Sequence, residues 1–176
     1  MTTRASAISP LGAVARGIAA GVLGTAAMTA WQELSARLMS SGDAQDSGGE
    51  ETEPQDPWEQ ASAPAKLAKR IGEGVFQQEV SADRIPLLTN AMHWGYGTAW
   101  GVVYGLVAGS ASSTAPVRRG AIFGAGVWAM SYVQLVPMGL SKLPWTYPAK
   151  DMAMELSYHV VYGVGAEAGF AAARRV

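Results

Sequence analysis

Charged side chains are absent from long stretches of this chain and concentrated in others. Asp, Glu, Lys and Arg are missing from residues 17–32, 85–117 and 120–141. A helix that crosses a membrane needs about 20 mostly apolar residues, because a charge in hydrocarbon costs several kcal/mol. The pattern predicts four membrane-spanning helices, over residues 11–34, 87–110, 119–140 and 151–173.

Three short motifs occur twice, in the same order. G-x-x-A-M-[ST]-x-x-Q spans residues 24–32 and 126–134, and His-x-x-Tyr-Gly spans residues 93–97 and 159–163. Pro-Trp followed by Pro-Ala-Lys begins at Pro57 and again at Pro144. Such a repeat indicates one duplicated two-helix unit. We therefore expect an all-α fold: an integral membrane four-helix bundle built from two tandem two-span repeats.

Glycines recur at four-residue spacing on the predicted spans. In hydrocarbon, helices associate through close packing, and glycine lets two backbones approach. We expect these faces to pack against another span of the same chain or of a second copy, which would make a homo-oligomer. The packing glycines are Gly17, Gly21, Gly97, Gly101, Gly105, Gly109, Gly120, Gly124, Gly165 and Gly169.

The segments between the spans differ in charge. The ends near Arg16, Arg119 and Arg174 are basic without acidic residues, which favours the cytoplasmic side and places both termini there. Residues 40–63 hold Ser, Gly, Asp and Glu, which cannot bury a core, so we predict a disordered acidic loop. Residues 64–80 are predicted to form an amphipathic helix inserted in the first repeat. It would lie on the membrane surface or cap the bundle.

Composition narrows the alternatives. A soluble Gly- and Ala-rich bundle is the alternative to a membrane protein, but a soluble helix normally carries a charged stripe, and residues 87–110 lack one. There is no cysteine, so disulfides and thiolate metal sites are excluded. A net charge of −1 gives no case for nucleic acid as a partner. The lipid bilayer is the expected partner.

Ionisable side chains inside a predicted span are the first candidates for function. Glu155 and His159 lie four residues apart, so they share one helix face, which Glu167 continues. His93 occupies the matching place in the second span. This face predicts a polar crevice that passes or senses protons or a small solute, because histidine titrates near neutral pH. A purely structural Glu155–His159 pair, and a headgroup position for Glu167, remain open.

Other chemistry has weaker support. Two histidines at matching depth leave a haem or metal protein as a distant alternative. No H-E-x-x-H, C-x-x-C-H or G-x-S-x-G motif is present, so we expect no metal, no cofactor and no enzymatic activity. Trp58 and Trp145 follow the first and third spans and are predicted to be interface anchors, because Trp favours the water–lipid boundary.

The second half resembles the YagU-like family of small, poorly characterised bacterial inner-membrane proteins. The resemblance is carried by Pro137-Met138-Gly139-Leu140, Leu143-Pro144-Trp145 and Glu155-x-x-x-His159, with His93 and Tyr96 similar as well. It is best over residues 119–167 and weak in the first span, where Met28 stands in place of a lysine of the family. It implies a multi-pass bacterial plasma-membrane protein and leaves the substrate open. A non-transporting accessory or scaffold protein is the alternative function.

Overall fold

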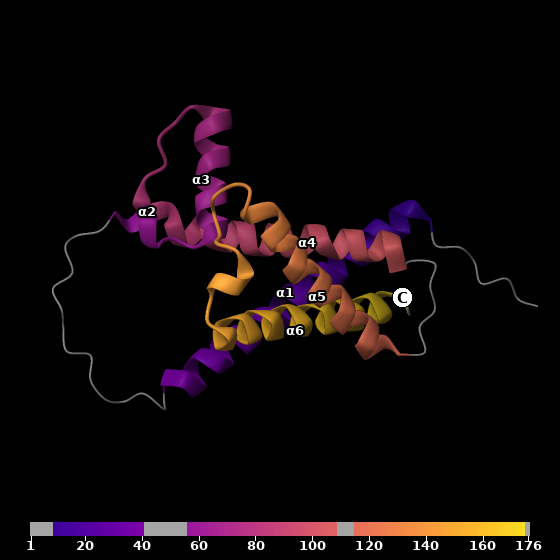
Figure 1. The fold of residues 1–176 in the computed structure, drawn as a ribbon. Helices are drawn as coiled ribbons and strands as arrows, with labels where there is room; N and C mark the ends of the chain where they lie inside the picture. The colour runs from indigo at the N-terminus through magenta and orange to yellow at the C-terminus, as the bar shows by residue number, and fades with distance from the viewer. Residues whose placement is uncertain (1–8, 41–55, 109–114, 175–176) are drawn as a thin grey trace, which may run out of the picture.

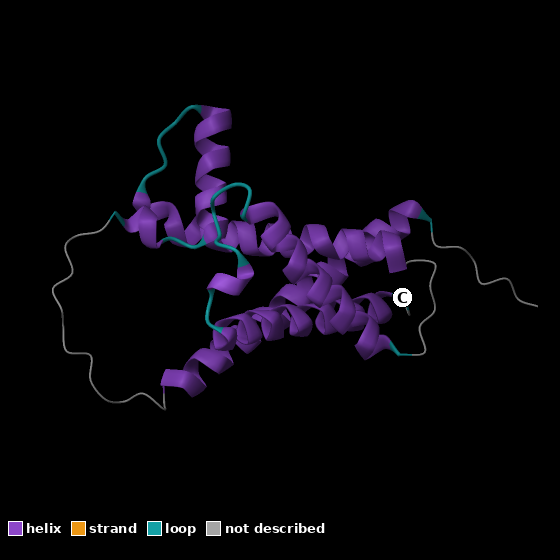
Figure 2. Ribbon diagram, viewed as in Figure 1, coloured by secondary structure: helices purple, strands orange, loops and turns teal. Residues whose placement is uncertain are grey.

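The computed structural model describes residues 9–40, 56–108 and 115–174, and this part of the chain contains helices and loops but no strands (Figure 2). The all-α class is therefore confirmed. The elements are α1 (Pro10–Ser40), α2 (Pro57–Gln60), α3 (Ala63–Phe76), η1 (Ala82–Arg84), α4 (Ile85–Ala108), α5 (Pro116–Leu135), η2 (Pro144–Thr146) and α6 (Ala149–Ala173).

Four long helices form the body of the molecule (Figure 1). α1 packs against both α4 and α6, and α5 packs against α6. α4 and α6 diverge toward the end of the molecule that carries α3, which stands crosswise to α4 (Figure 1). α1 and α6 are thus the central pair, with α4 and α5 on their outer sides.

Glycines bring the backbones of these helices together. A Cβ atom on Gly17 would lie 2.7 Å from the Gly101 carbonyl oxygen, and one on Gly21 would lie 2.6 Å from the Thr98 Cα atom. A Cβ atom on Gly120 would lie 2.6 Å from the Gly163 carbonyl oxygen. No side chain fits at such distances, so α1 with α4, and α5 with α6, depend on glycine for their approach.

The remaining packing glycines also face helices of the same chain. Gly97 and Gly105 meet α1, Gly124 meets α6, and Gly165 and Gly169 meet α1. Gly109 lies outside the described residues. The described glycine faces are therefore occupied within one chain, and a homo-oligomer would have to use another surface.

One described helix, α1, is long and apolar enough to cross a membrane by length and composition. Its position near the N-terminus makes this weak support on its own. α4 has no charged residue, but it contains Thr, Asn and His and does not meet this criterion. α5 and α6 contain several charged residues near their ends. This criterion therefore supports one of the four predicted spans, and the other three stay predictions.

The end of α5 is decided by a proline and a glycine. Pro137 cannot donate a backbone hydrogen bond, and the regular helix ends at Leu135 rather than at residue 140. Gly139 then adopts a φ of 66°. The Leu140 amide donates to the Leu135 carbonyl at 3.0 Å, and the Gly139 amide donates to the Val136 carbonyl at 3.0 Å. This glycine-dependent pattern closes helix ends.

Part of the predicted acidic loop is ordered. Residues 41–55 lie outside the described part, but Pro57–Gln60 form α2, because the Asp56 carboxylate accepts a hydrogen bond from the Trp58 amide at 2.9 Å. Trp58 is only 9% exposed and lies under the Lys69 ammonium, 4.7 Å from the ring centre. It therefore differs from the predicted lipid anchor, whereas Trp145 is 77% exposed.

The helix predicted over residues 64–80 is shorter in the structure. α3 begins at Ala63, where the Ser62 hydroxyl caps the Ala65 amide, and it ends at Phe76. Gln77 adopts a left-handed conformation with a φ of 52°, and this conformation stops the helix. α3 packs on α4, while Ile71, Val75 and Phe76 remain exposed.

Candidate functional site

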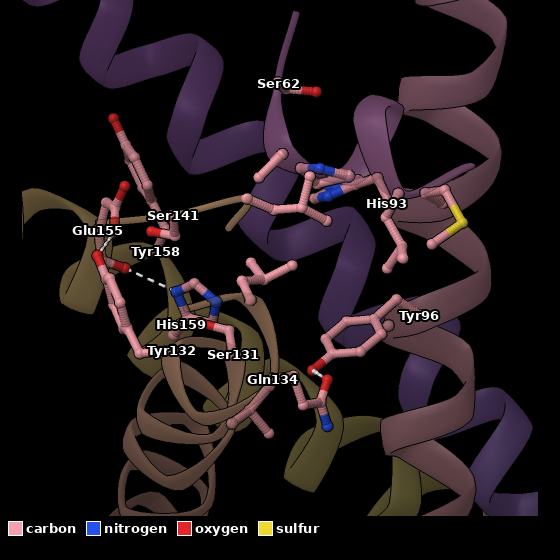
Figure 3. Close-up of a pocket in the computed structure, with 18 of the residues that line it drawn as sticks. Ser62, His93, Tyr96, Ser131, Tyr132, Gln134, Ser141, Glu155, Tyr158 and His159 are labelled. Atoms are coloured by element: carbon pink, nitrogen blue, oxygen red, sulfur yellow. Dashed lines mark hydrogen bonds between the residues drawn. The ribbon is translucent and has the colours of Figure 1, made fainter. Parts of the chain in front are cut away.

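A cavity of about 570 Å³ lies at the end of the bundle where α4 and α6 diverge (Figure 3). All four long helices contribute to its wall, and α3 and the loop before η2 cover part of it. His93, Glu155 and His159 line this one cavity, although His93 and His159 are 66 positions apart. The structure thus brings together three of the four residues predicted to form a polar site.

The His159 ring is held by its own helix. Its Nδ1 atom lies 2.8 Å from the Glu155 carbonyl oxygen (Figure 3). A carbonyl oxygen only accepts hydrogen bonds, so the proton is on Nδ1. The neutral ring therefore keeps a lone pair on Nε2. The sequence suggested a Glu155–His159 pair; the structure makes it through the backbone of Glu155 rather than through its carboxylate.

The His93 ring is held by α1. Its Nε2 atom lies 3.1 Å from the Thr29 hydroxyl oxygen. The Thr29 hydroxyl donates its own hydrogen to the Thr25 carbonyl, 2.9 Å away, so it accepts the hydrogen bond from His93. The neutral His93 ring therefore keeps its lone pair on Nδ1. The two histidines are fixed through opposite ring nitrogens, and each retains one acceptor.

Glu155 is tied to the neighbouring helix α5. The Tyr132 hydroxyl donates to the Glu155 carboxylate at 2.6 Å, and Tyr132 itself is buried. Glu155 is exposed, and both histidines are half-buried. The carboxylate and both imidazoles line one cavity, with Glu155 and His159 on one side and His93 on the other (Figure 3). Such side chains can exchange protons.

Two further tyrosines connect helices around the cavity. Tyr162 of α6 donates to the Gly97 carbonyl of α4 at 2.6 Å, and Tyr96 of α4 donates to the Gln134 side chain of α5 at 2.8 Å (Figure 3). Both tyrosines line the cavity. These hydrogen bonds link α4 to α6 and to α5 around the cavity.

Glu167 belongs to a different contact. Its carboxylate accepts two hydrogen bonds from Arg119, at 2.6 and 2.9 Å, and Glu167 is 5% exposed. The Arg119 guanidinium also lies over the Tyr104 ring, 5.8 Å from its centre. Glu167 does not line the cavity. It ties α5 to α6 at the opposite end of the bundle and is no part of the polar site to which the sequence assigned it.

Sequence reasoning missed several residues of the cavity wall, although a signal for them was present. Gln32, Ser131 and Gln134 come from the two copies of G-x-x-A-M-[ST]-x-x-Q, and Tyr96 and Tyr162 come from the two copies of His-x-x-Tyr-Gly. In the sequence these motifs predict a duplicated two-helix unit. Because a repeated polar residue needs a shared environment, they also indicated which side chains meet.

No metal centre is built in the described part of the chain, where no three His, Cys, Asp or Glu side chains are grouped to hold an ion. A haem or metal would depend on His93 and His159 without a third ligand of this kind. The prediction that the protein has no cofactor stays a prediction.

Residues 46–168 match the model of a family described as a protein of unknown function, DUF1440. The chain belongs to this family. The matched range holds α2 to α5, most of α6 and all cavity residues except those of α1. No curated protein and no solved structure matches the chain.

Proposed function

We propose that this chain is a multi-pass protein of the bacterial inner membrane that binds a small solute in its polar cavity and exchanges protons there. The motifs that resemble the YagU-like family all lie within the matched residues 46–168. That resemblance supports the membrane location and leaves the solute open.

The outer surface supports the membrane location. Large apolar side chains are exposed on three of the long helices, where water would disfavour them. They are Ile18, Val22 and Leu23 on α1, Val103, Leu106 and Val107 on α4, and Ile122 and Val133 on α5. α3 stands crosswise to α4 and exposes Ile71, Val75 and Phe76, as a helix on a membrane surface would (Figure 1).

A duplicated two-span unit is supported by the packing of the helix pairs. Gly97 of α4 contacts α1, and Gly163 of α6 contacts α5, so each copy of His-x-x-Tyr-Gly packs on the long helix that precedes it in the proposed unit. Gly163 meets the backbone of Gly120 and Gly124, and Gly97 meets the Thr25 side chain. The pairs α1–α4 and α5–α6 would be the two units.

The observation that carries the functional proposal is the convergence of both histidine motifs on one cavity. His93 with Tyr96, and His159 with Tyr162, come from distant segments and face the same space. A volume of about 570 Å³ is of the size that small-molecule sites have. Polar side chains that serve packing alone do not need to surround an open volume.

The opposite end of the bundle favours binding over free passage. Ala20, Tyr104, Ala108, Ala166 and Phe170 form a buried cluster there, and Phe123 packs against it. A solute in the cavity meets this cluster rather than an open path. Transport would therefore require the helices to move, and binding or sensing requires no such movement.

The test uses the full chain in proteoliposomes and nanodiscs. We expect a solute from a small-molecule panel to raise the thermal stability of the wild type, and Glu155→Gln and His159→Ala to lose this response while remaining folded. Glu33→Gln is the matched control, because Glu33 is exposed on α1 and does not line the cavity. A proton or solute flux lost in the same two variants would add transport; no response to any solute and no flux would refute the proposal.

An accessory or scaffold role is the second candidate. It is favoured by the exposed apolar residues of α3, which the rest of the described chain leaves uncovered. This role predicts no solute response and a co-purifying protein that is lost in Val75→Ser. If Val75→Ser changes only lipid binding, α3 contacts the membrane instead.

A further inference from the structure

We infer that the cavity takes a small protonated amine with an apolar body. This inference rests on the proposed function and names the class of its solute. It is carried by the hydrogen bonds around the two histidines, where the hydroxyl donors are already used and three acceptors are not.

The hydroxyl hydrogens around the histidines are already used. Tyr132 donates to Glu155, Tyr162 donates to the Gly97 carbonyl, and Tyr96 donates to Gln134. Ser131 donates to the Trp128 carbonyl at 2.7 Å, and Thr25 donates to the Gly21 carbonyl at 2.8 Å. Since a hydroxyl has one hydrogen, none of these groups has another to offer a ligand.

Three acceptors on the same wall are not used within the described residues. They are Nδ1 of His93, Nε2 of His159 and Oε1 of Glu155. An ammonium group carries up to three hydrogens and no acceptor, so it can donate to the Glu155 carboxylate or to either free ring nitrogen. At the two histidines a carboxylate or phosphate ligand would find lone pairs facing its own lone pairs, and the Glu155 carboxylate would repel its charge.

The remaining polar groups allow this assignment. Lys66 is the basic side chain of the wall, and its ammonium donates to the Glu59 carbonyl at 2.7 Å. The amides of Gln32 and Gln134 can turn either an oxygen or a hydrogen toward a ligand, apart from the Gln134 oxygen that Tyr96 uses. Among the described residues that line the cavity, Glu155 is the one carboxylate.

The rest of the wall suits an apolar body. Met28, Leu67, Met92, Val127, Leu135 and Leu140 line the cavity together with the tyrosines. Aromatic rings and thioethers attract a cation and its attached carbons. A volume of about 570 Å³ admits a molecule of the size of an aromatic amine.

The experiment measures the binding of three probes of similar shape to the full chain in nanodiscs at neutral pH, by calorimetry. Phenethylamine is the cation, 2-phenylethanol the neutral analogue and phenylacetate the anion. We expect phenethylamine to bind about tenfold more tightly than 2-phenylethanol, because a hydrogen bond to a charged group is worth more than a neutral one. Phenylacetate should not bind. Glu155→Gln should remove the preference, and Glu33→Gln should keep it.

Two results overturn the inference. If 2-phenylethanol or phenylacetate binds as tightly as phenethylamine, the amine class is wrong. Loss of that binding in Tyr132→Phe or His159→Ala would show that the cavity still binds solutes. If phenethylamine, ethylamine and propylamine all fail to bind, the inference fails whatever else binds. The proposed function fails separately, when no solute of the panel affects stability and no flux is found. Circular dichroism of each variant shows whether it is folded.

Discussion

The two ends of the four-helix body differ in how their side chains meet. At one end, Gly17 of α1 and Gly101 of α4 bring two backbones together, and Tyr104 and Phe170 fill what remains. At the other end α4 and α6 diverge around a cavity of about 570 Å³ (Figure 1). Glycine contacts close one end of the bundle, and the separation of α4 from α6 leaves the other end open.

Polar contacts follow the same division. The closed end has the Arg119–Glu167 ion pair, whose two side chains are 22% and 7% exposed. At the open end single hydrogen bonds, such as that from Tyr132 to Glu155, connect the helices around an accessible space. We expect changes at the closed end to affect folding and changes at the open end to affect binding.

The largest effect is expected at the glycine contact of the closed end. A Cβ atom on Gly101 would collide with the backbone of Gly21 and Gly17, whereas one on Gly95, in the same helix, has nothing within 4 Å. Gly101→Ala should lower the free energy of unfolding by about 3 kcal/mol, because backbone atoms cannot move aside. Gly95→Ala should leave it unchanged or raise it by up to about 1 kcal/mol. Denaturant titration in mixed micelles measures both, and equal losses would show that glycine packing does not hold this end.

The ion pair of the closed end should rank next. Glu167→Gln removes a charge that accepts two hydrogen bonds from Arg119 and should cost about 2 kcal/mol of unfolding free energy. Glu33→Gln removes an exposed partner of Arg37 and should cost about 0.5 kcal/mol or less. The same titration compares them. If Glu167→Gln is as stable as Glu33→Gln, the Arg119–Glu167 pair does not hold α5 to α6.

A smaller stability effect is expected at the open end. Tyr132→Phe removes the hydrogen bond to Glu155 and should cost about 1 kcal/mol of unfolding free energy. It should also change solute affinity, because the Glu155 carboxylate loses its link to α5. Thermal unfolding with and without solute measures both quantities. If Tyr132→Phe lowers the free energy of unfolding as much as Gly101→Ala does, contacts at the two ends contribute equally to stability.

The smallest effect on stability is expected from the exposed tryptophan beside the open end. Trp145→Phe should leave unfolding unchanged and should remove fluorescence that headgroup-proximal brominated lipids quench, because Trp145 is 77% exposed. Trp58→Phe is the control, since Trp58 is buried under Lys69. A loss of quenched signal in Trp58→Phe, with none in Trp145→Phe, would reverse the assignment of the interface.

Local sequence rules anticipated much of the helical framework. A proline inside a helix removes a backbone donor, and the regular part of α5 ends at Leu135, two residues before Pro137. Missing charges and four-residue glycine spacing indicated packed helices of this kind. The exact end of α3 was missed, because it depends on the left-handed conformation of Gln77, which no composition rule assigns to glutamine.

The candidate site was anticipated in part. Glu155 and His159 share a helix face because four residues make about one turn, a repeated motif links His93 to them, and all three line one cavity. Glu167 was grouped with them by the same periodicity, but it lies further along the helix, where Arg119 of α5 is its neighbour. Helix periodicity specifies a face, and it does not specify which neighbour each turn of that face meets.

The sequence by itself determined that this chain is helical, where charge is excluded, and which side chains recur in pairs. Only the tertiary structure decided that the glycine faces are used within one chain, that Trp58 is buried and that both histidine motifs face one cavity. The physical reason is the distance along the chain over which each effect acts. Helix propensity and periodicity act over a few residues, whereas burial, ion pairing and cavities depend on which distant surfaces the packed helices bring into contact.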